Sequence, residues 1–501
     1  MTETLLLALD QGTTSTRAAL YGLDGRERAA AGRPLVQHYP ADGWVEHDPE
    51  EIAAASIAVI REVLERAKGD ALGAVAALGL TNQRQTTIVW DRDTGRAIAP
   101  AIVWQDRRTA AECARLAAAG AEPEIRRKTT LPLDPYFSAT KIAWLLDHVE
   151  GARPAAEAGR LAFGTVDAWL VWRLTGGQVH ATDATNAACT SLYDLERGGW
   201  DEGLCRLFRV PASLLPEVRA TADDYGLGDA GLLGTSLPIR ACVGDQQAAL
   251  MGQGCVRAGE IKCTYGTGAF MLLHTGEALV RSSSGLLSGH AARLAGRDTY
   301  AVEGSVFIAG AAVQWAAEAF GVEGGPAGVE RLARGAREDH AVVLVPAFTG
   351  LGAPWWDSGA RGALVGMTRD TGLAEIAAAA IDSAAHQTGD ILEAMRADFP
   401  DCLPPGAGLR IDGGMASSPA FAQRLADLTG VPVDRADYTE TTALGAAMFA
   451  GLGAGVFETV EAASALRPQT ERFTPALPAD QRQAARGRWL EAVGRVVSRQ
   501  A

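Results

Sequence analysis

The stretch that decides the fold is Leu5–Tyr21, which reads LLLALDQGTTSTRAALY. Leu5 to Leu9 is an apolar run that ends in the acid Asp10, and Arg17 to Tyr21 is apolar again after its first residue. The residues between these runs are polar, with one glycine and four hydroxyl side chains. Short apolar runs on either side of such a cluster are typical of two strands joined by a tight turn. The stretch predicts a hairpin whose tip displays hydroxyl and backbone N–H groups.

A similar order recurs in the second half of the chain. Gly259–Thr264 is strand-like, Tyr265–Gly268 reads YGTG, and Ala269–Leu273 is a second apolar run. Later, Leu409–Gly414 is a short apolar run that ends in Asp-Gly-Gly. Strands and helices alternate, which argues for an α/β fold. Two halves that open alike predict a duplicated fold with a cleft between the halves, although glycine turns between strands also occur in unduplicated α/β proteins.

The region after the first hairpin predicts a helix and two buried strands. Asp48 is a good N-cap, Pro49 suits the first helical turn, and apolar residues recur with helical spacing from Ile52 to Leu64. Ala76–Leu80 and Thr87–Trp90 are apolar runs of strand length. The region therefore continues the alternation of strands and helices.

Length and composition indicate a globular protein and disfavour several partners. The chain has 501 residues, of which 48% are hydrophobic and 21% are charged. Its 46 basic and 60 acidic side chains give a net charge of −14, which disfavours nucleic acid as a partner. The seven cysteines form no CxxC pair, and the N-terminus lacks a basic leader. Thr441–Phe457 is uncharged but short and glycine-rich, so we expect a cytoplasmic protein without membrane insertion.

The familiar phosphate-binding motifs do not fit this chain. None of its lysines follows a Walker A loop, and the GxGxxG string at Gly226–Gly231 follows two acids rather than a strand. A glycine turn with adjacent hydroxyls is a different device, because its backbone N–H groups converge on one anion. Asp10–Thr14 and Tyr265–Gly268 are two such turns, one from each half. Facing each other, they would hold a triphosphate, and Asp10 would hold Mg²⁺ through water. Each turn alone reads more simply as a plain hairpin.

The chain resembles the FGGY carbohydrate kinase family of the sugar-kinase/Hsp70/actin superfamily. The resemblance runs from about residue 5 to about residue 460. It rests on the two turns, on Asp412–Gly414, and on these further strings: Gly43–Pro49, Thr81–Arg84, Ile102–Gln105, Arg107–Thr109, Asp134–Ser138, Gly164–Asp167, Gly244–Ala248, Pro346–Pro354 and Thr442–Ala446.

The resemblance implies two actin-like (ribonuclease H-like) domains with a cleft between them and ATP-dependent phosphorylation of a small polyol, with glycerol as the expected substrate. Residues 1–250 would form the N-terminal domain, with the polyol site and the first phosphate motif. Residues 251–501 would form the C-terminal domain, with the second phosphate motif and the adenosine site. ATP and Mg²⁺ are the implied cofactors, and a homodimer or homotetramer is the implied assembly.

The resemblance also assigns residues. The catalytic pair would be Asp245, as the base for the attacking hydroxyl, and Asp10, as the metal-linked acid. The polyol site would comprise Arg84, Gln85, Trp104, Tyr136, Asp245, Gln246 and Phe270. The nucleotide site would comprise Thr13, Thr14, Ser15, Arg17, Thr267, Gly310, Gln314, Gly414 and Ser418.

Ordinary structural roles compete with several of these assignments. Trp104 and Phe270 stand in apolar stretches, where an aromatic side chain is usually part of the core. Arg84 has acids within reach in sequence, at Asp91 and Asp93, for a surface ion pair. Asp245 would serve equally well as the cap of a helix beginning at the next residue.

The chain departs from the family pattern at four places. Gln85 stands where glycerol-phosphorylating members usually have Glu, so an acceptor loses its charge and gains a donor. Ser418 replaces a frequent Asn near the adenine, and His386 replaces a usual Tyr, for which we expect a packing role. Leu232–Ser236 lacks the arginine with which regulated members bind fructose 1,6-bisphosphate, so we expect no strong inhibition by that effector.

Two other functions remain open at this stage. Because of Gln85, the protein could instead be a kinase for another short polyol or ketose, such as erythritol or xylulose. The superfamily also contains nucleotide-dependent binding modules that are not enzymes. We see no peptide-binding extension after residue 460 and no helix-turn-helix before Leu5, and the polyol residues are nearly complete, which favours an enzyme.

Overall fold

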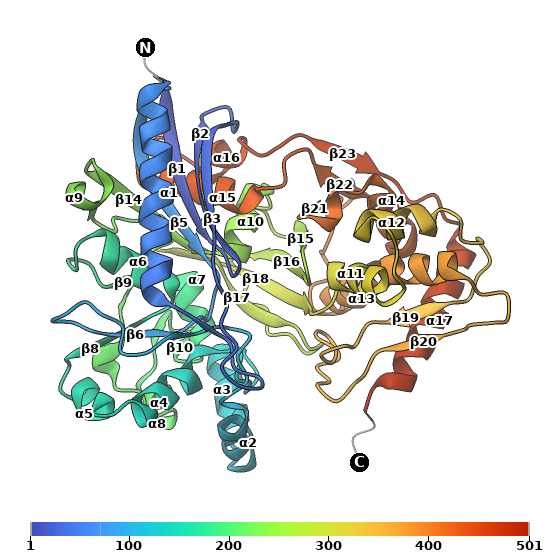
Figure 1. The fold of residues 1–501 in the computed structure, drawn as a ribbon, viewed down its shortest axis with the longest axis horizontal. Coiled ribbons are helices and arrows are strands. Elements are labelled where there is room, and N and C mark those ends of the chain that lie inside the picture. Colours follow the sequence, from blue (N-terminus) through green and yellow to red (C-terminus); the bar gives the residue numbers. More distant parts are fainter. Residues whose placement is uncertain (1–2, 71, 499–501) are drawn as a thin grey trace.

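Two mixed β-sheets organise the computed structural model, which describes residues 3–70 and 72–498 (Figure 1). The first sheet has the strand order β13-β14-β5-β1-β2-β3. In chain order its strands are β1 (Thr4–Gln11), β2 (Ser15–Gly22), β3 (Glu27–Pro34), β5 (Ala74–Asn82), β13 (Leu227–Gly228) and β14 (Leu237–Gly244). β1 runs antiparallel to β2 and parallel to β5, so the hairpin predicted at Leu5–Tyr21 is confirmed.

Alternate side chains of β1 enter two different cores. Leu5, Leu7 and Leu9 pack on the side of helices α1 (Pro49–Gly69) and α6 (Val166–Leu174). Leu6 and Ala8 pack on the opposite side, against helices α10 (Asp245–Gly252) and α15 (Thr441–Gly453). A strand that is buried on both faces is continuously apolar, which is why this run lacks a polar alternation.

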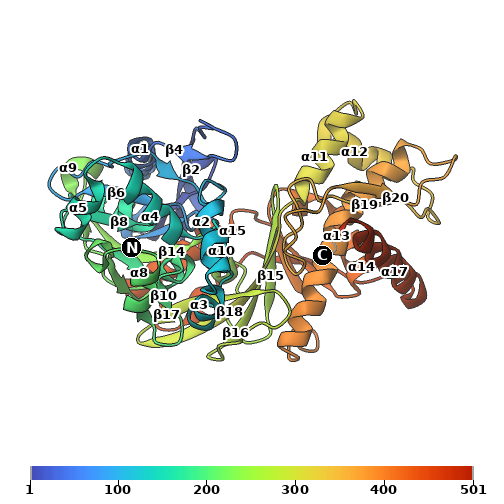
Figure 2. The ribbon, with the colours of Figure 1, turned by 90° about the horizontal axis from the view of Figure 1, so that it is seen from below.

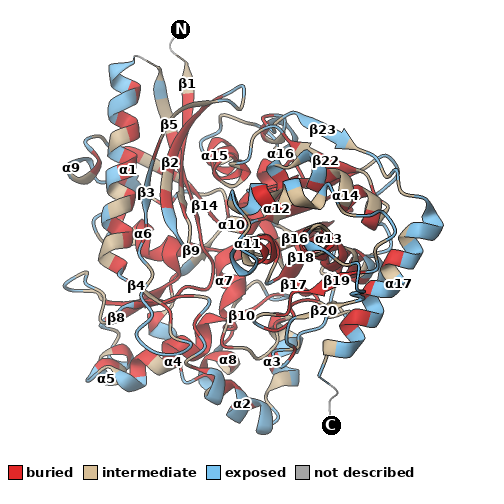
Figure 3. Ribbon diagram, turned by 45° about the vertical axis from the view of Figure 1, so that its right-hand side comes forward, coloured by how far each residue is buried: buried red, intermediate tan, exposed pale blue. Residues whose placement is uncertain are grey.

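The second sheet has the strand order β17-β18-β16-β15-β21-β22-β23. Its strands are β15 (Ile261–Tyr265), β16 (Ala269–Gly276), β17 (Leu287–Leu294), β18 (Arg297–Val306), β21 (Leu409–Asp412), β22 (Val433–Ala436) and β23 (Thr470–Phe473). Helices α13 (Leu373–Asp398) and α14 (Pro419–Thr429) share a buried core with one face of this sheet. Helix α17 (Ala479–Val496) lies outside α14, and Figure 3 shows its outer surface exposed.

The two sheets repeat one topology, which supports the predicted duplication. In the first, an antiparallel run β1-β2-β3 is continued on the other side of β1 by parallel strands β5 and β14. In the second, β15-β16-β18 is antiparallel, and β21 and β22 continue in parallel on the other side of β15. Each half therefore opens with a strand, a tight turn and a strand, as the sequence predicts.

Helices α10 and α15 lie between the two sheets (Figure 2). Helix α15 packs on β1, β5 and β14 of the first sheet, although it follows second-sheet strands along the chain. Helix α10 contacts α15 on one side and strands β15, β16 and β17 on the other. The uncharged run at Thr441–Phe457 is thus mostly a buried helix, and its apolar surface faces protein on nearly every side.

Other elements extend the two domains. Eight of those inserted between β5 and β14 share a separate apolar core and are β6 (Ile88–Asp91), β7 (Ala101–Ile102), α2 (Ala110–Ala118), α3 (Glu122–Thr129), α4 (Ser138–His148), α5 (Ala152–Glu157), β8 (Leu161–Gly164) and α8 (Glu202–Leu207). The other insertions are β9 (Ala181–Asp183), α7 (Ala184–Ala187), β10 (Tyr193–Asp194), β11 (Gly199–Trp200), β12 (Glu217–Arg219) and α9 (Ala230–Leu233). The remainder are β4 (Glu46–His47), α11 (Gly310–Ala319), α12 (Gly325–Ala333), β19 (Val343–Val345), β20 (Ala363–Val365) and α16 (Val460–Ser464).

Local expectations for the remaining segments hold. Helix α1 begins at Pro49 and its N-cap is Asp48, whose side chain accepts a hydrogen bond from the Glu50 backbone N–H. The GxGxxG string spans β13 and the short helix α9 at the edge of the first sheet, so it is not the start of a dinucleotide-binding helix. Within residues 3–70 and 72–498, none of the helices is both long and apolar enough to cross a membrane.

Candidate active site

The first predicted phosphate turn joins β1 to β2. Inside it, the Gly12 backbone N–H donates to the Ser15 carbonyl at 2.9 Å, which closes the turn. The Gln83 amide donates to the Gly12 carbonyl at 3.1 Å, and the Trp104 indole N–H donates to the Thr13 hydroxyl at 2.9 Å. Thr14 and Ser15 are exposed at the tip, as a phosphate-binding turn requires. Thr13 therefore links the turn to an aromatic residue of the predicted polyol site.

The second predicted phosphate turn joins β15 to β16 in the other domain. The Gly266 backbone N–H donates to the Gly268 carbonyl at 2.8 Å, and Thr267 is exposed at the tip. Helix α11 begins against this turn, because the Gly310 N–H donates to the Gly266 carbonyl at 3.1 Å. A Cβ at Gly310 would lie 2.6 Å from that carbonyl oxygen, so a side chain there would force the turn and the helix apart. Gln314 follows one turn later on α11, and its amide donates to Glu318.

The Asp-Gly-Gly segment lies beside the second turn. Strand β21 is paired in parallel with β15, and Gly413 follows it with φ +88°. A Cβ at Gly413 would lie 2.5 Å from the Tyr265 carbonyl oxygen, so only glycine allows the two segments this close. Ser418 caps helix α14 by accepting from the Phe421 N–H at 3.1 Å. The predicted nucleotide residues Thr267, Gly310 and Gly414 thus gather near the carboxyl ends of β15 and β21.

Arg84 and Asp245 meet at the boundary between the domains. The Arg84 guanidinium is buried, and its Nε lies 3.1 Å from Asp245 Oδ1. Its two terminal nitrogens donate to the Glu303 carboxylate on β18 at 2.6 and 2.9 Å. The surface ion pair with Asp91 or Asp93 is therefore wrong: the acids that bind Arg84 come from α10 and from the second sheet. Asp245 is the first residue of α10, one position after the N-cap Gly244, and its Oδ1 accepts from the Gln246 backbone N–H at 2.7 Å. Asp245 therefore binds an N–H of the first helical turn as well as Arg84.

Two carboxylates of this region, Asp245 and Asp10, have raised pKa values. Burial raises the pKa of Asp245, and the positive charges of Arg84 and Lys262 oppose that rise. Burial, together with the negative charges of Asp245 and Glu440, raises the pKa of Asp10 to about 7. Such mutual repulsion places Asp10 and Asp245 in one electrostatic neighbourhood. Carboxylates perturbed in this way are typical of functional sites.

Aromatic side chains from both domains face the same place. Trp104 and Tyr136 come from the first domain and pack edge to face, with ring centroids 5.7 Å apart. Phe270 comes from β16 of the second sheet, and its ring centroid lies 6.5 Å from that of Trp104. Trp104 and Phe270 are half-buried rather than fully enclosed, so neither belongs to a closed core. The geometry suits the apolar C–H edges of a polyol.

Gln85 occupies a strained turn beside Arg84. Its φ is +63°, and the Thr86 N–H donates to the Arg84 carbonyl at 2.8 Å, which makes Gln85 the centre of a tight three-residue turn. The Ser138 hydroxyl donates to the Gln85 carbonyl at 2.9 Å and holds this conformation. The side chain is buried and lines a cavity of about 20 Å³ together with Arg84 and Glu303. A positive φ outside glycine costs energy and is often found at functional sites.

Two predicted residues have ordinary partners in this structure. Arg17 donates to Glu27 at 2.8 Å and lies 3.8 Å from Glu440. Gln246 is buried, and its Oε1 accepts from Lys262 Nζ at 2.6 Å.

His386 stacks on Trp489 of α17 with ring centroids 5.1 Å apart, which confirms the packing role expected for it.

Two charged residues of the site, Lys262 and Glu303, are not among those predicted from the sequence. Both are buried on strands of the second sheet and contact predicted polyol residues of the first domain. A signal exists for each, because Lys262 is the one charged side chain of β15 and Glu303 follows the uncharged run Thr299–Val302 of β18. Such residues are rarely buried without a partner, and the partner points to the site.

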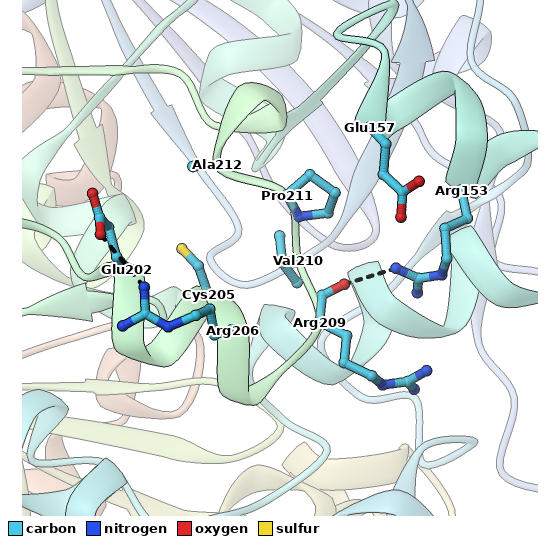
Figure 4. A pocket seen from close by; sticks show the side chains of 9 residues that line it. All are labelled: Arg153, Glu157, Glu202, Cys205, Arg206, Arg209, Val210, Pro211 and Ala212. Atoms are coloured by element: carbon cyan, nitrogen blue, oxygen red, sulfur yellow. Dashed lines mark hydrogen bonds and ion pairs between the residues drawn. The ribbon is translucent and has the colours of Figure 1, made fainter.

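A larger pocket elsewhere does not belong to this site. It has a volume of about 420 Å³ and lies between α5, α8 and residues 209–212 (Figure 4). Arg153 and Arg209 bind Asp147, and Arg206 lies 3.5 Å from Glu202. Its arginines therefore already have acidic partners, and its lining contains none of the predicted site residues.

Comparisons with known proteins identify the family of the chain. The N-terminal domain of the FGGY family of carbohydrate kinases matches residues 5–252, and the C-terminal domain of that family matches residues 261–454. The chain belongs to the FGGY family of carbohydrate kinases.

Within the family, the chain is similar to glycerol kinases. It is 53% identical over 495 residues to the glycerol kinase of Methylobacterium nodulans, covering 99% of this chain and 98% of that protein. It is also 53% identical over 494 residues to the glycerol kinase of Rhodospirillum centenum, covering 98% of each. Its structure resembles the crystal structure of Plasmodium falciparum glycerol kinase with ADP, with a TM-score of 0.91, 33% identity and 99% of each chain covered.

Proposed function

We propose that this protein transfers the γ-phosphoryl group of ATP to glycerol, giving sn-glycerol 3-phosphate. The observation that carries the proposal is the meeting of Asp245 and Arg84 at 3.1 Å beside the aromatic residues Trp104, Tyr136 and Phe270. A carboxylate, a guanidinium donor and apolar ring surfaces are the groups that would bind a small polyol, which supports the proposal. The glycerol kinases that share half of its residues support the choice of substrate.

In the proposed reaction Asp245 accepts the proton of the attacking glycerol hydroxyl. Phosphoryl transfer needs an aligned nucleophile and charge stabilisation, with little covalent work by the protein. Arg84 donates to hydroxyl oxygens, and its bidentate pair with Glu303 fixes the plane of the guanidinium. Trp104 and Phe270 enclose the carbon backbone. Gln246 and Tyr136 complete the polyol site, and Gln85 lies next to Arg84.

The nucleotide binds between the two turns in this proposal. Thr13, Thr14, Ser15 and Arg17 contact the phosphates from the first domain, and Thr267 contacts them from the second. The adenosine side comprises Gly310, Gln314, Gly414 and Ser418. The gathering of the second-domain residues at the ends of β15 and β21 supports this assignment.

Asp10 fits the chemistry of a magnesium site. Its carboxylate lies one residue before the end of β1, beside the first turn, and burial together with nearby negative charge raises its pKa to about 7, a cost that a dication would relieve. Among the residues that the structure describes, no group of three or more acids, histidines or cysteines is arranged to hold a metal alone. Mg²⁺ commonly takes one carboxylate, several waters and substrate phosphates, so one acid is sufficient. When bound, Mg²⁺ would neutralise phosphate charge.

A substrate panel tests the proposal. Purified protein is assayed with MgATP and glycerol, erythritol, xylulose or gluconate, with ADP release coupled to NADH oxidation. We expect the highest kcat/KM for glycerol, with sn-glycerol 3-phosphate as the product. A kcat/KM for erythritol or xylulose that exceeds the glycerol value by tenfold would favour the second candidate, a kinase for another short polyol or ketose, for which Gln85 is the supporting residue.

A further inference from the structure

Lys262 reaches across the domain boundary and binds a residue of the polyol site. It lies on β15 of the second sheet, and its side chain is fully buried. Its Nζ donates to Gln246 Oε1 at 2.6 Å and to Thr264 Oγ1 at 3.0 Å. Gln246 lies on α10, which packs against helix α15, and α15 packs on the first sheet. Burial of an ammonium group costs free energy unless the group is well hydrogen-bonded. The hydrogen bonds to Gln246 and Thr264 offset that cost for Lys262.

The contact with Lys262 decides which way the Gln246 amide points. An ammonium group only donates, so the atom of Gln246 that faces it must be the oxygen. The Nε2 group then lies on the other side of the planar amide. If Gln246 contacts the polyol, it therefore presents a donor to a hydroxyl oxygen, whereas an amide without Lys262 would be able to present either end.

We propose that Lys262 is a positioning residue for the polyol: it holds the Gln246 amide so that Nε2 donates to a substrate hydroxyl, and it supplies positive charge beside Asp245. The proposal rests on the proposed function, because it needs Gln246 and Asp245 to contact the substrate. It also makes substrate alignment depend on the second domain, since the residue that orients Gln246 is carried by β15.

Both cations and anions lie near Asp245, so the loss of any one of these charges is expected to change its pKa. Arg84 and Lys262 are the cations that face it, and Glu303 on β18 and Asp10 on β1 are the anions. Burial lowers the pKa of Lys262, and the negative charges of Asp412 at the end of β21, Glu303 and Asp245 oppose that fall and favour its ammonium form. Loss of the Lys262 charge removes one of the two cations that favour the ionised form of Asp245. The pKa of Asp245 is then expected to rise.

The test compares Lys262→Met with the wild-type protein. Met keeps the length of the side chain and removes the donor and the charge. We expect KM for glycerol to rise about tenfold, as for a lost charged hydrogen bond, with KM for ATP within about twofold. We also expect the acid limb of the kcat/KM pH profile to move to higher pH. Lys128→Met is the matched control, because Lys128 binds Asp201 outside the site, and it should leave both quantities unchanged.

A second variant tests the orientation of the amide directly. Gln246→Glu keeps a partner for Lys262 and removes the Nε2 donor, so KM for glycerol should rise about tenfold or more. A Gln246→Glu protein that binds glycerol as well as the wild type would overturn the proposal, since the oxygen would then be the end that meets the substrate. An unchanged KM together with an unmoved acid limb in Lys262→Met would also overturn it.

Failure of the proposed function gives a different result. A wild-type protein that phosphorylates erythritol or xylulose but not glycerol contradicts the choice of substrate alone. The same variants, assayed with the substrate that is used, still test Lys262. If Lys262→Met does not fold, as judged by thermal denaturation, Lys262→Arg keeps the charge and Gln246→Glu still decides the orientation. Lys262→Arg should leave the acid limb in place, and a shifted limb would contradict the electrostatic role.

Discussion

Gln85 combines a strained backbone with an uncharged side chain at the proposed polyol site. Its positive φ is held by hydrogen bonds to the carbonyls of Arg84 and of Gln85 itself. A carboxylate at this position would accept a hydroxyl hydrogen bond with charge assistance. We predict that Gln85→Glu lowers KM for glycerol about tenfold, because a charged hydrogen bond exceeds a neutral one by about 1–2 kcal/mol. Steady-state kinetics measure this, and a KM that rises in Gln85→Glu would count against contact with glycerol.

Asp10 makes the free energy of unfolding depend on pH. Its pKa is about 7 in the folded protein and 3.8 as an unperturbed value, so the folded protein favours the protonated form. Ionisation of Asp10 therefore reduces the free energy of unfolding as pH rises from about 4 to about 7. We predict that Asp10→Asn lowers activity and raises Tm relative to the wild type, with a larger gain at pH 8 than at pH 4.

The control for this prediction is Asp24→Asn. Asp24 is exposed, and its side-chain hydrogen bond to Arg28 lowers its pKa, which is the opposite direction. Its replacement should produce no gain in Tm at pH 8. An Asp10→Asn protein whose Tm advantage shrinks as pH rises would contradict the cause assigned to the pKa of Asp10.

Among single residues, sequence reasoning found those with a turn or motif signature. Glycine and short polar runs predict the hydroxyl-bearing turns at Thr13–Ser15 and Thr267. Glu303 and Lys262 have no such signature, because their roles come from pairing with residues far away in the chain. Arg84 was foreseen as a site residue, but its main partner lies 219 positions away and cannot be read from local spacing.

At the scale of elements, the crossing of α10 and α15 depends on glycine. A Cβ at Gly445 of α15 would lie 1.8 Å from the Ala248 carbonyl oxygen of α10, and one at Gly252 would lie 1.9 Å from the Thr441 carbonyl oxygen. These contacts are with backbone atoms, so no side chain can move away to make room. The helices approach closely because both carry glycine at the contact, and α10 is the element that presents Asp245.

We predict that Gly445→Ala destabilises the protein by about 3 kcal/mol or more, because overpacking a rigid contact forces the helices apart. Activity should fall with stability, since α10 carries Asp245. The matched change is Gly487→Ala on α17, where a Cβ would have no atom within 4 Å. That variant should gain about 0.5–1 kcal/mol from helix propensity. Urea denaturation of both proteins gives the comparison, and a neutral Gly445→Ala would contradict the packing account.

Element identity was predictable here, but element placement was not. The apolar run from Leu5 and the YGTG turn predicted the strands that open each half, because strand and turn signals are local. Helix α15 is apolar on all sides, so its sequence alone does not distinguish a buried helix from a short membrane segment. The close backbone contacts of α15 with α10 at Gly445 and with β5 at Gly79 show that α15 fills the space between the sheets.

At the scale of the whole molecule, two domains of one topology contribute different parts of the proposed site. The first supplies Arg84, Trp104 and Asp245, and the second supplies Phe270, Lys262 and Glu303. The paired charges Arg84–Glu303 and the Lys262–Gln246 contact join the domains at the site itself. Changes in the angle between the domains would therefore alter substrate alignment directly, and closure would exclude water from the reacting phosphate.

The effector response is a second property of the whole molecule. Residues 231–236 contain no cation, and the nearest following arginine, Arg240, is paired with Asp224. We predict that fructose 1,6-bisphosphate at 1 mM, which is on the order of a metabolite concentration, leaves the rate within about twofold of its uninhibited value, because no arginine of this segment is present to bind phosphate. Steady-state assays over an effector titration test this, and half-inhibition below about 0.1 mM would contradict it.

Activation of an alcohol by Asp245 at the boundary between the domains is tested by comparing Asp245→Asn with the wild-type protein. Turnover of glycerol by Asp245→Asn is measured beside its affinity for ATP, with calorimetry for the affinity. We expect kcat to fall about 10²–10⁴-fold, because Asn cannot accept the proton of the attacking hydroxyl. We expect the Kd for ATP to stay within about twofold of the wild-type value. A kcat within tenfold of the wild-type value, in a protein that still binds ATP, would contradict it.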